Sequence, residues 1–386
     1  MDKTALSLNN RFSARVVSEL DDLGKLRDDW NELAAKQGAY MPFLCFDWFR
    51  LWLEHFLDDH QLLILLVYKH DNLETIAPFL VKQQKFKGIR VRKVELIGNV
   101  YSPVQTFLFK DVDNEKRENQ ISLILQYFSR INKHWDVIDL QSIPEEDDTF
   151  QILGNAIKKS GFKNKEHFCF GNWYLDGIDY SSDTYFKNRS RNVRAGIKKN
   201  YRKAEEAGKW QFKMITSDCE VRENMKTYFH VYAKSWKKGE RVGPNFYMDF
   251  TEQAAKKGWL RLGLVILDSI PIAAGFAIVC DGFAYFAKSG YDERYKNLGA
   301  GSIWLAEMIK YVIDVDKVSV IDLLRGEDEY KRRWVAKRRE RKGLLLFNNN
   351  LKGNCLSLLI QYALPTFNRY KYISKIKALA ASKVSK

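Results

Sequence analysis

The feature that most constrains the fold is an order of elements that occurs twice along the chain. In the first half, hydrophobic periodicity predicts two helices over residues 21–36 and 47–56. Three β-type runs joined by short polar turns follow, and they predict an antiparallel meander over QLLILLVYK, TIAPFLVKQQKF and KVELIG. A helix over 121–131, the buried strand WDVIDLQSI and a helix over 149–159 complete this half.

The second half repeats this order after a polar stretch that contains Gly171 and Gly177. The predicted elements are helices over 185–208 and 219–237, the hairpin-linked strands RLGLVILD, PIAAGFAIVC and FAYFAKSG, a helix over 302–314, the strand VSVIDLLRG and a short helix over 328–338. A period of about 170 residues is far too long for a solenoid and indicates a duplicated domain. We therefore expect an α/β fold with mixed α+β sheets, in tandem domains at 1–176 and 177–350, followed by a basic helical tail at 351–386.

Charge is divided unevenly between the halves. Residues 1–176 hold 23 Lys and Arg against 26 Asp and Glu, whereas residues 177–386 hold 40 against 22. The basic half is therefore expected to meet an anionic partner, such as a phosphorylated cofactor, a nucleic acid or a membrane surface.

Cysteine usage and hydropathy narrow the class of protein. The 5 cysteines are scattered, with no C-x-x-C pair and no metal-ligand spacing, which favours a reduced protein without a metal. The first residues lack the apolar core of a secretory signal, and the longest uncharged run, 353–368, contains Pro365 and is too short to span a bilayer. We expect a cytoplasmic protein, with peripheral attachment to the inner membrane face as an extension of that expectation.

A glycine-rich stretch, Tyr295 to Leu305, stands at the end of the second meander and opens an apolar helical pattern. The start of a helix leaves unpaired backbone N–H groups, and glycines let them converge on one point, which is a geometry that binds phosphate. The alternative is a turn and helix entry that only need flexible residues.

The stretch in its context resembles the GNAT acyltransferase superfamily, whose motif Gln/Arg-x-x-Gly-x-Gly/Ala lies between a strand and a helix. The segment from FAYFAKSG to EYKRRW is further similar to the polysaccharide- or cellulose-biosynthesis-associated subfamily related to the Fem aminoacyltransferases. FDWFRLWLEHF, TIAPFL and VELIGNVYSP extend the likeness more weakly to the first half. The resemblance implies two GNAT-like domains, the first degenerate and on the substrate side, the second binding acyl-CoA.

The resemblance also implies a cofactor site. The phosphate loop maps onto Lys296, Asn297, Leu298, Gly299, Ala300 and Gly301, with a lysine where the family has Gln or Arg. Two parallel strands, FAYFAKSG and VSVIDLLRG, would splay to admit the thioester, which backbone groups of Ala287, Lys288 and Ser289 would contact. The expected cofactor is acetyl-CoA or another acyl-CoA, without a metal.

Four residues are catalytic candidates. Asp322, inside an apolar strand, is a candidate base because burial raises a carboxyl pKa; the alternative is a structural pair with an arginine. Glu329, like Glu327, is another candidate base or a helix-start carboxylate favoured by the dipole. Tyr330 and Lys331 match the aromatic-lysine pair of the Fem-like signature, where the lysine steadies developing negative charge; alternatively Lys331 belongs to the basic run KRRWVAKRRERK.

Three further signature residues, Tyr291, Asp292 and Arg325, are expected to shape the acceptor pocket or brace its loop. The basic run Lys187 to Lys203 reads by default as a solvated helix face. The tail from Tyr370 fits either a helix that contacts anionic lipid or one that docks on the protein itself.

The leading hypothesis is an acyl-CoA-dependent N- or O-acyltransferase, of the acetyltransferase kind, that acts on a saccharide, an amino sugar or a lipid-linked acceptor during surface polysaccharide assembly. The alternatives are Fem-like transfer of an amino acid from aminoacyl-tRNA, which the basic surface would suit, and a non-catalytic binding or assembly protein on a GNAT fold. Apart from tRNA in that alternative, no nucleic-acid partner is expected.

Overall fold

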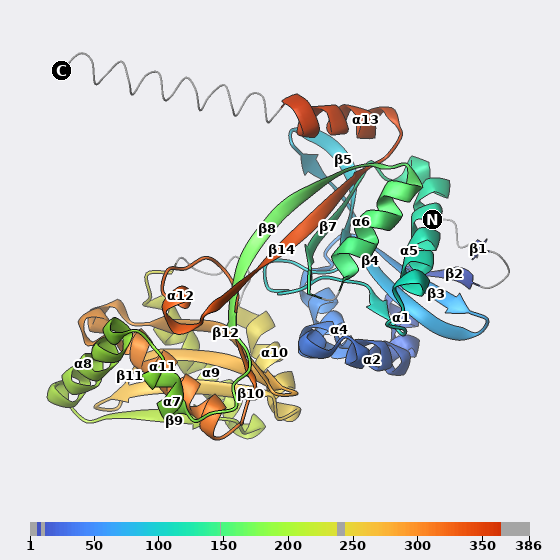
Figure 1. The fold of residues 1–386 in the computed structure, drawn as a ribbon. Coiled ribbons are helices and arrows are strands. Elements are labelled where there is room, and N and C mark those ends of the chain that lie inside the picture. Colours follow the sequence, from blue (N-terminus) through green and yellow to red (C-terminus); the bar gives the residue numbers. More distant parts are fainter. Residues whose placement is uncertain (1–5, 9–11, 147, 238–243, 364–386) are drawn as a thin grey trace, which may run out of the picture. The chain divides into compact units, whose positions relative to one another are not determined.

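The computed structural model describes residues 6–8, 12–146, 148–237 and 244–363. The chain forms two compact units (Figure 1). Unit 1 comprises Met1–Gln37, Leu57–Cys169 and Arg341–Lys386, and unit 2 comprises Gly38–Phe56 and Phe170–Glu340. Neither unit is continuous in sequence, so the division differs from the contiguous ranges that the sequence led us to expect.

Unit 1 is a mixed sheet with helices on its faces. Its strands are β1 (Leu6–Leu8), β2 (Phe12–Val17), β3 (Gln61–Lys69), β4 (Asn72–Phe86), β5 (Ile89–Leu96), β6 (Leu108–Phe109), β7 (Val137–Ile143), and parts of β8 (Lys163–Leu175) and β14 (Lys337–Phe347). Its helices are α1 (Leu20–Leu23), η1 (Gly24–Leu26), α2 (Arg27–Lys36), α5 (Asn114–Arg130), η3 (Asn132–His134), α6 (Thr149–Ser160), α13 (Leu351–Leu358) and the π-helical turn η5 (Leu359–Ala363).

The unit 1 sheet runs in the order β1-β2-β3-β4-β5-β7-β14, and β6 pairs with β4. The predicted meander is confirmed, because β3, β4 and β5 pair antiparallel. Helix α5 begins where the Asp113 side chain accepts a hydrogen bond from Lys116 N–H, and it connects β5 to the parallel strand β7.

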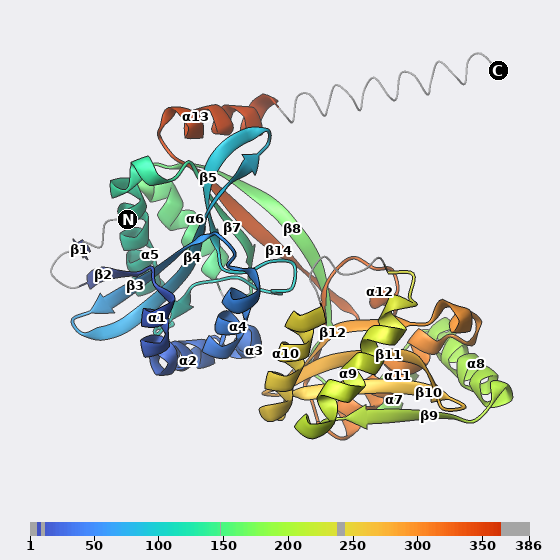
Figure 2. The same ribbon diagram turned by 180° about the vertical axis from the view of Figure 1, so that it is seen from behind.

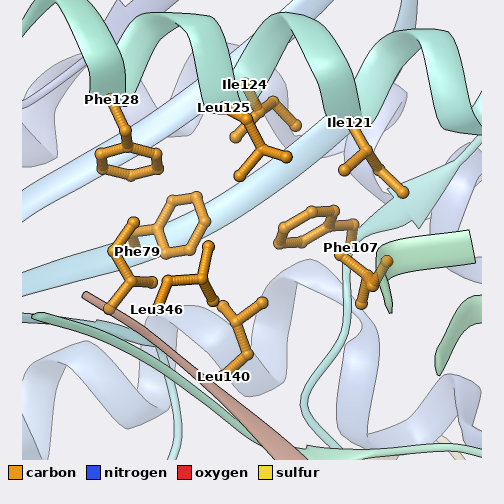
Figure 3. Close-up of a pocket in the computed structure, with 10 residues that line it drawn as sticks. Phe79, Phe107, Ile121, Ile124, Leu125, Phe128, Leu140 and Leu346 are labelled. Carbon is orange, nitrogen blue, oxygen red and sulfur yellow. The ribbon is translucent and has the colours of Figure 1, made fainter. Parts of the chain in front are cut away.

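The core of unit 1 lies between this sheet and helices α5 and α6. Figure 3 shows the apolar side chains that meet there, among them Phe79, Phe107 and Phe128. They surround a cavity of about 10 Å³, which is no larger than one water molecule requires. The interior is therefore closely packed and offers no room for a ligand.

The strands of unit 2 are paired in the order β8-β13-β12-β11-β10-β9, with parallel and antiparallel neighbours. Its strands, besides parts of β8 and β14, are β9 (Trp210–Ile215), β10 (Leu260–Leu267), β11 (Ile270–Cys280), β12 (Phe283–Tyr291) and β13 (Val320–Arg325). Its helices are η2 (Gly38–Tyr40), α3 (Met41–Leu44), α4 (Phe46–Phe56), α7 (Ser182–Lys187), α8 (Arg191–Ala207), α9 (Asp218–Ala233), α10 (Pro244–Lys256), η4 (Glu293–Leu298), α11 (Ala300–Asp314) and α12 (Lys331–Trp334).

Helices cover both faces of the unit 2 sheet. In Figure 1, α7, α8 and α11 lie in front of it, and in Figure 2, seen from behind, α9 and α10 cover the opposite face. The Trp304 indole of α11 donates to the Gly263 carbonyl of β10 at 2.9 Å, and Phe276 of β11 contacts Tyr228 of α9 on the other side. The mixed α/β architecture expected from the sequence is thus confirmed.

The chain leaves unit 1 twice, at residues 38–56 and at residues 170–340, and both of these segments belong to unit 2. After β7 and α6, strand β8 runs out of unit 1 and its last residues pair with β13 of unit 2. After β13 and α12, strand β14 returns to unit 1 and pairs antiparallel with β7. Unit 2 therefore includes the end of β8, which comes from the predicted first domain, and unit 1 includes most of β14, which comes from the predicted second domain.

Several elements differ from the sequence expectation. The single helix over 185–208 is wrong: Ser190 accepts from Val193 N–H and begins α8 anew, because a serine cap favours a helix start. The helix over 328–338 is also wrong beyond Trp334, since the basic run continues as β14. Strands β8 and β9 and helix α10 were not expected.

Among the residues that the structure describes, no helix is long and apolar enough to cross a lipid bilayer. Within the same residues, no group of His, Cys, Asp and Glu side chains is arranged to hold a metal ion.

Candidate functional site

Strands β12 and β13 are parallel neighbours for only a short distance. Their register pairs are Phe283 with Val320, Ala284 with Ile321 and Tyr285 with Asp322. Beyond Tyr285, β12 continues to Tyr291 beside β11, while β13 continues to Arg325 beside β8. The two strands therefore separate after the Tyr285–Asp322 pair, and beyond it they no longer pair with each other.

Local irregularities bend both strands at this point. In β12, Phe286 and Lys288 pair with consecutive residues of β11, so that Ala287 is a bulge. In β13, Leu324 has a φ of 51°, where the register with β8 shifts. The sequence predicted that these two strands splay, and the pairing pattern shows that they do.

The predicted donor-contact residues Ala287, Lys288 and Ser289 all lie on the part of β12 beyond the separation. The Ser289 carbonyl accepts a hydrogen bond from Lys237 Nζ at 2.6 Å, so this carbonyl points away from β11. The ammonium of Lys288 lies 5.8 Å from the Tyr247 ring centroid. Residues 287–289 are each partly exposed.

The predicted phosphate loop joins β12 to helix α11. Gly299, with a φ of 72°, is the N-cap, and no side chain caps the helix. The Ser302 and Ile303 N–H groups both donate to the Gly299 carbonyl, at 2.9 and 3.1 Å. Within the described part of the chain, the Ala300 and Gly301 N–H groups have no protein acceptor. Of these two N–H groups at the positive end of the helix dipole, that of Ala300 belongs to a fully buried residue, whereas Gly301 is partly exposed.

Helix α8 adds side chains to this loop that the sequence analysis did not assign to it. The Asn200 side chain lies against Gly299, where its nitrogen would be 2.3 Å from an added Cβ. Lys203 Nζ donates to the Asn297 carbonyl at 2.8 Å and brings a positive charge beside the helix start. Both residues belong to the basic run 187–203, which we had interpreted as a solvated face.

The other loop residues are more exposed. Lys296 is an exposed residue whose ammonium lies 3.8 Å from the Glu293 carboxylate, and Leu298 is half-buried. Gly301 lies against the ring of Tyr291, because an added Cβ would be 2.8 Å from the ring Cδ1 atom. Packing thus gives both glycines of the motif a structural reason.

Lys331 is buried at the end of β13. Its Nζ donates to the carbonyls of Leu323 at 2.8 Å, Leu324 at 3.4 Å and Arg325 at 2.7 Å. Burial, with a smaller contribution from Lys237, lowers the pKa of Lys331 to about 8. The ammonium thus holds the bent end of β13 in its conformation and is close enough to Lys237 to be repelled by it.

Asp322 is fully buried and fully paired. Its Oδ1 accepts from Asn172 Nδ2 at 2.7 Å and from Leu324 N–H at 2.7 Å, and its Oδ2 accepts from Arg339. Arg339 Nε also donates to Asn172 Oδ1 at 2.6 Å. This network corresponds to the structural alternative that the sequence analysis weighed for Asp322.

Tyr285, opposite Asp322, is a buried residue that the sequence analysis did not single out. Its hydroxyl has no hydrogen-bond partner among the described residues. Burial, and then the Asp322 carboxylate, raises the pKa of Tyr285, so that the phenol stays protonated.

The remaining candidates lie around the turn after β13. Glu329 is exposed and pairs with Arg332 and Arg333, which lower its pKa. Glu327 pairs with Arg338, which likewise lowers its pKa. Tyr330 is 42% exposed. The structure therefore brings Asp322 and Lys331 together at the strand separation and leaves Glu329 in solvent.

The two signature residues outside this turn have structural partners. The Arg325 guanidinium lies 4.2 Å from the Phe170 ring centroid. Asp292 is buried, caps η4 through Arg294 N–H at 3.0 Å and pairs with the Arg294 side chain, which lowers the pKa of Asp292. Asp292 thus braces the loop between β12 and α11.

Unit 1 contains the counterpart of this arrangement, but a loop occupies it. Strands β5 and β7 are parallel over three register pairs that end with Glu95 and Asp139, and the tetrapeptide VIDL begins both β7 and β13. Beyond that point Gln105 N–H donates to the Ser142 carbonyl at 3.1 Å, and residues 104–107 are buried. Asp139 pairs with Lys93 at 2.6 Å. In the described part of unit 1 the helix after β5, α5, is capped by the Asp113 side chain, whereas in unit 2 the helix after β12, α11, has no side-chain cap.

Comparison with known proteins gives a family match and several fold matches. Residues 191–332 match the family described as "Acetyltransferase (GNAT) domain". No functionally curated protein matches the sequence. Among solved structures, the chain is similar to FemX, with a TM-score of 0.58 and 12% identity, over 89% of this chain and 98% of that one.

Two further solved structures have a similar fold. One is the C-terminal domain of a putative lysylphosphatidylglycerol synthetase from Agrobacterium fabrum, with a TM-score of 0.52, 9% identity, and coverage of 87% of this chain and 97% of that one. The other is L-PGS from Bacillus licheniformis, with a TM-score of 0.51, 11% identity, and coverage of 89% and 95%. At these identities the likeness concerns the fold.

Proposed function

Because this chain carries an acyltransferase domain of the GNAT superfamily, we propose that it transfers an acyl group from acyl-CoA to an amine or hydroxyl of a saccharide or amino-sugar precursor. The observation that carries the donor assignment is the separation of β12 and β13 in the same unit as the uncapped start of α11. A nucleotide-linked thioester needs both an extended slot and an anion site.

The donor would lie along β12. Its pyrophosphate would accept a hydrogen bond from the partly exposed Gly301 N–H group, with Lys203 and Lys296 adding positive charge. Its pantetheine amides would pair with the edge of β12 beyond the separation, where the Ser289 carbonyl is now bonded to Lys237. Helix α8 then contributes to donor binding through Asn200 and Lys203.

The reaction is direct transfer. The acceptor nitrogen or oxygen forms a bond to the thioester carbonyl carbon and loses a proton, the carbon–sulfur bond breaks, and the CoA thiolate that leaves takes up one proton to give the free thiol. Backbone N–H groups of β12 near Ala287 would polarise the carbonyl in a site that excludes water. No enzyme nucleophile is needed.

Asp322 and Lys331 act as positioning residues in this proposal. Asp322 connects β13 to Arg339 and Asn172, and Lys331 binds three carbonyls at the bent end of β13. Together they hold the conformation in which β13 diverges from β12. The gap for the thioester therefore depends on two charged side chains that need not touch it.

The acceptor class rests on the resemblance of the segment 283–334 to polysaccharide-associated acyltransferases. Tyr291, Asp292 and Arg325 are the residues we propose to border the acceptor pocket. The exposed basic residues of α8 favour an acceptor or donor that carries phosphate.

The proposal is tested by measuring the melting temperature with free CoA, acetyl-CoA, longer acyl-CoAs and aminoacyl-tRNA added separately. We expect free CoA to raise it, because the diphosphate and the pantetheine arm supply most of the contacts. A shift with aminoacyl-tRNA and none with CoA would assign the donor to the second candidate. No shift with either would favour a non-catalytic binding protein.

That second candidate is transfer from aminoacyl-tRNA. Its supporting observation is α8, which exposes Arg191, Arg194, Lys198 and Lys199 on a helix beside the α11 start. Such a surface suits an RNA backbone, whose binding falls steeply with salt. The uncapped α11 start and the separation of β12 from β13 favour CoA.

A further inference from the structure

The helix at the end of unit 1 exposes a row of apolar side chains. Along α13 and η5, Leu351 is 81% exposed, Leu358 is 58% exposed and Tyr362 is 64% exposed. Their spacing places them on one side of the helix, together with the exposed Cys355. This outward row, which we call the α13 face, carries no charged side chain.

The inner side of the same helix is held by the core. Leu356 and Ile360 are buried among Val91, Val137, Leu345 and Phe347. Phe86 and Ile89, at the turn between β4 and β5, pack against the same cluster. The α13 face is therefore held in place by an anchored helix, and Figure 1 shows the turn of β4 and β5 lying beside α13.

Basic residues lie beside the helix that carries the α13 face. Lys163 Nζ donates to Asn354 Oδ1 at 2.8 Å, and Lys165 Nζ donates to the Ile360 carbonyl at 2.7 Å. At the turn, Lys85, Lys87 and Arg90 are exposed. Residues 84–93 and 351–363 contain no Asp or Glu, so these two segments carry only positive charge.

The chain beyond the helix has the same character. Residues 364–386, which lie outside the described residues, contain Arg369, Lys371, Lys375, Lys377, Lys383 and Lys386 and no acidic residue. They also contain Phe367, Tyr370 and Tyr372.

We propose that the α13 face is a docking surface for an anionic lipid bilayer. Leucine and tyrosine side chains of such a face enter the boundary between headgroups and acyl chains, and a rim of lysines and arginines binds anionic headgroups. A protein partner would need a compensating acidic and apolar surface of defined shape, whereas a bilayer matches an apolar row within a basic rim without one. The protein then works beside a membrane, which suits acceptors that carry a lipid.

The test is co-sedimentation of the full chain with phosphatidylcholine vesicles that contain or lack phosphatidylglycerol. We expect binding to the anionic vesicles, weaker binding to pure phosphatidylcholine and a loss of binding at high salt. Combined Leu351→Ser, Leu358→Ser and Tyr362→Ser substitutions should weaken binding by roughly tenfold or more.

The matched control replaces three exposed valines elsewhere, Val100, Val112 and Val315, with serine. This variant should bind vesicles like the wild type, and the melting temperatures of both variants check that they fold. Equal loss in the control, undiminished binding of the α13 variant, or equal binding to phosphatidylcholine overturns the proposal.

Measurements on the same proteins distinguish the bilayer from two other candidates for covering the α13 face. A chain that ends at Ala363 should bind the anionic vesicles more weakly; stronger binding would mean that residues 364–386 cover the face. A wild-type dimer that the α13 substitutions convert to a monomer, without vesicle binding by either, would assign the face to a second copy.

Discussion

Tyr285 lies directly opposite Asp322 in the parallel ladder of β12 and β13, and this pair is the last before the two strands separate. Both side chains are buried at this point. Asp322 has protein partners on both carboxylate oxygens, whereas the Tyr285 hydroxyl has none among the described residues. The separation is thus fixed from the β13 side.

The substitution Asp322→Asn tests whether the Asp322 carboxylate stabilises β13 at the strand separation. Because Arg339 would lose its buried partner, we expect the free energy of unfolding to fall by about 3–5 kcal/mol, measured by urea denaturation. The control is Glu327→Gln, which breaks the more exposed pair with Arg338 and should cost at most about 1 kcal/mol. Equal stabilities of the two variants would contradict the structural role of Asp322.

Lys331 provides a test of pH dependence. Its pKa in the folded protein is about 8, below the ordinary value of 10.5. Between these two values the unfolded chain holds the proton and the folded chain has lost it, so this residue makes the free energy of unfolding rise with pH across that window and remain level below it. Urea denaturation from pH 7 to 10.5 measures the free energy of unfolding of the wild type and of Lys331→Met. The increase with pH that Lys331 causes should be present in the wild type and missing in the variant.

The same variant has a second expected effect at neutral pH. Removing the ammonium leaves the carbonyls of Leu323 and Arg325 buried without a donor, which should destabilise the protein by about 2–4 kcal/mol. It should also weaken CoA binding, because β13 would be free to move toward β12. Unchanged CoA binding by a destabilised but folded variant would show that Lys331 does not maintain the gap between β12 and β13.

The Gly299→Ala substitution tests the geometry of the phosphate loop. Gly299 has a positive φ and an added Cβ would meet the Asn200 side chain, so we expect a loss of about 1–3 kcal/mol in stability and weaker CoA binding. The matched control is Gly196→Ala in α8, where an added Cβ meets nothing within 4 Å; it should stabilise by about 0.5–1 kcal/mol. Calorimetric binding and thermal unfolding report on both.

The contribution of α8 is tested by Lys203→Gln. Removing the Lys203 charge should weaken CoA binding by about fivefold, since a positive charge near the helix start contributes on the order of 1 kcal/mol to the binding of an anion. Arg202→Gln is the control, because Arg202 is the next residue and pairs with Glu206 at 3.4 Å instead. Equal effects of the two substitutions would show that general positive charge, and not the position of Lys203, promotes binding.

Much of the fold follows from local patterns. The apolar runs that become β3 and β11 and the turns at Asp268 and Asp281, which have positive φ values, are readable in the sequence because strands and tight hairpins depend on neighbouring residues. The splay of β12 and β13 was inferred from family resemblance and is present. The repeated tetrapeptide VIDL, at 137–140 and 320–323, was a further sign of the duplication that we did not use.

The site was only partly predictable. The loop 296–301 was identified from its glycines, but Asn200 and Lys203 come from a helix nearly a hundred residues earlier, and no spacing rule connects them. The partners of Asp322 are likewise remote, since Asn172 is 150 residues away in sequence. Glu329 looked equivalent to Asp322 as a carboxylate, and only packing distinguishes a buried residue from one in solvent.

The amino-acid sequence by itself determined the duplicated order of helices and strands, the glycines at the start of α11 and the excess of positive charge in the second half, because each depends on residues close together in the chain. The tertiary structure alone decided that β8 and β14 end in opposite units, that unit 1 fills its strand gap while unit 2 leaves its own open, and that Asp322 and Lys331 are paired. Those outcomes depend on which distant segments of the chain pack against one another. Hydrophobic burial and buried charge pairing join such segments, and no pattern of neighbouring residues in the sequence reveals them.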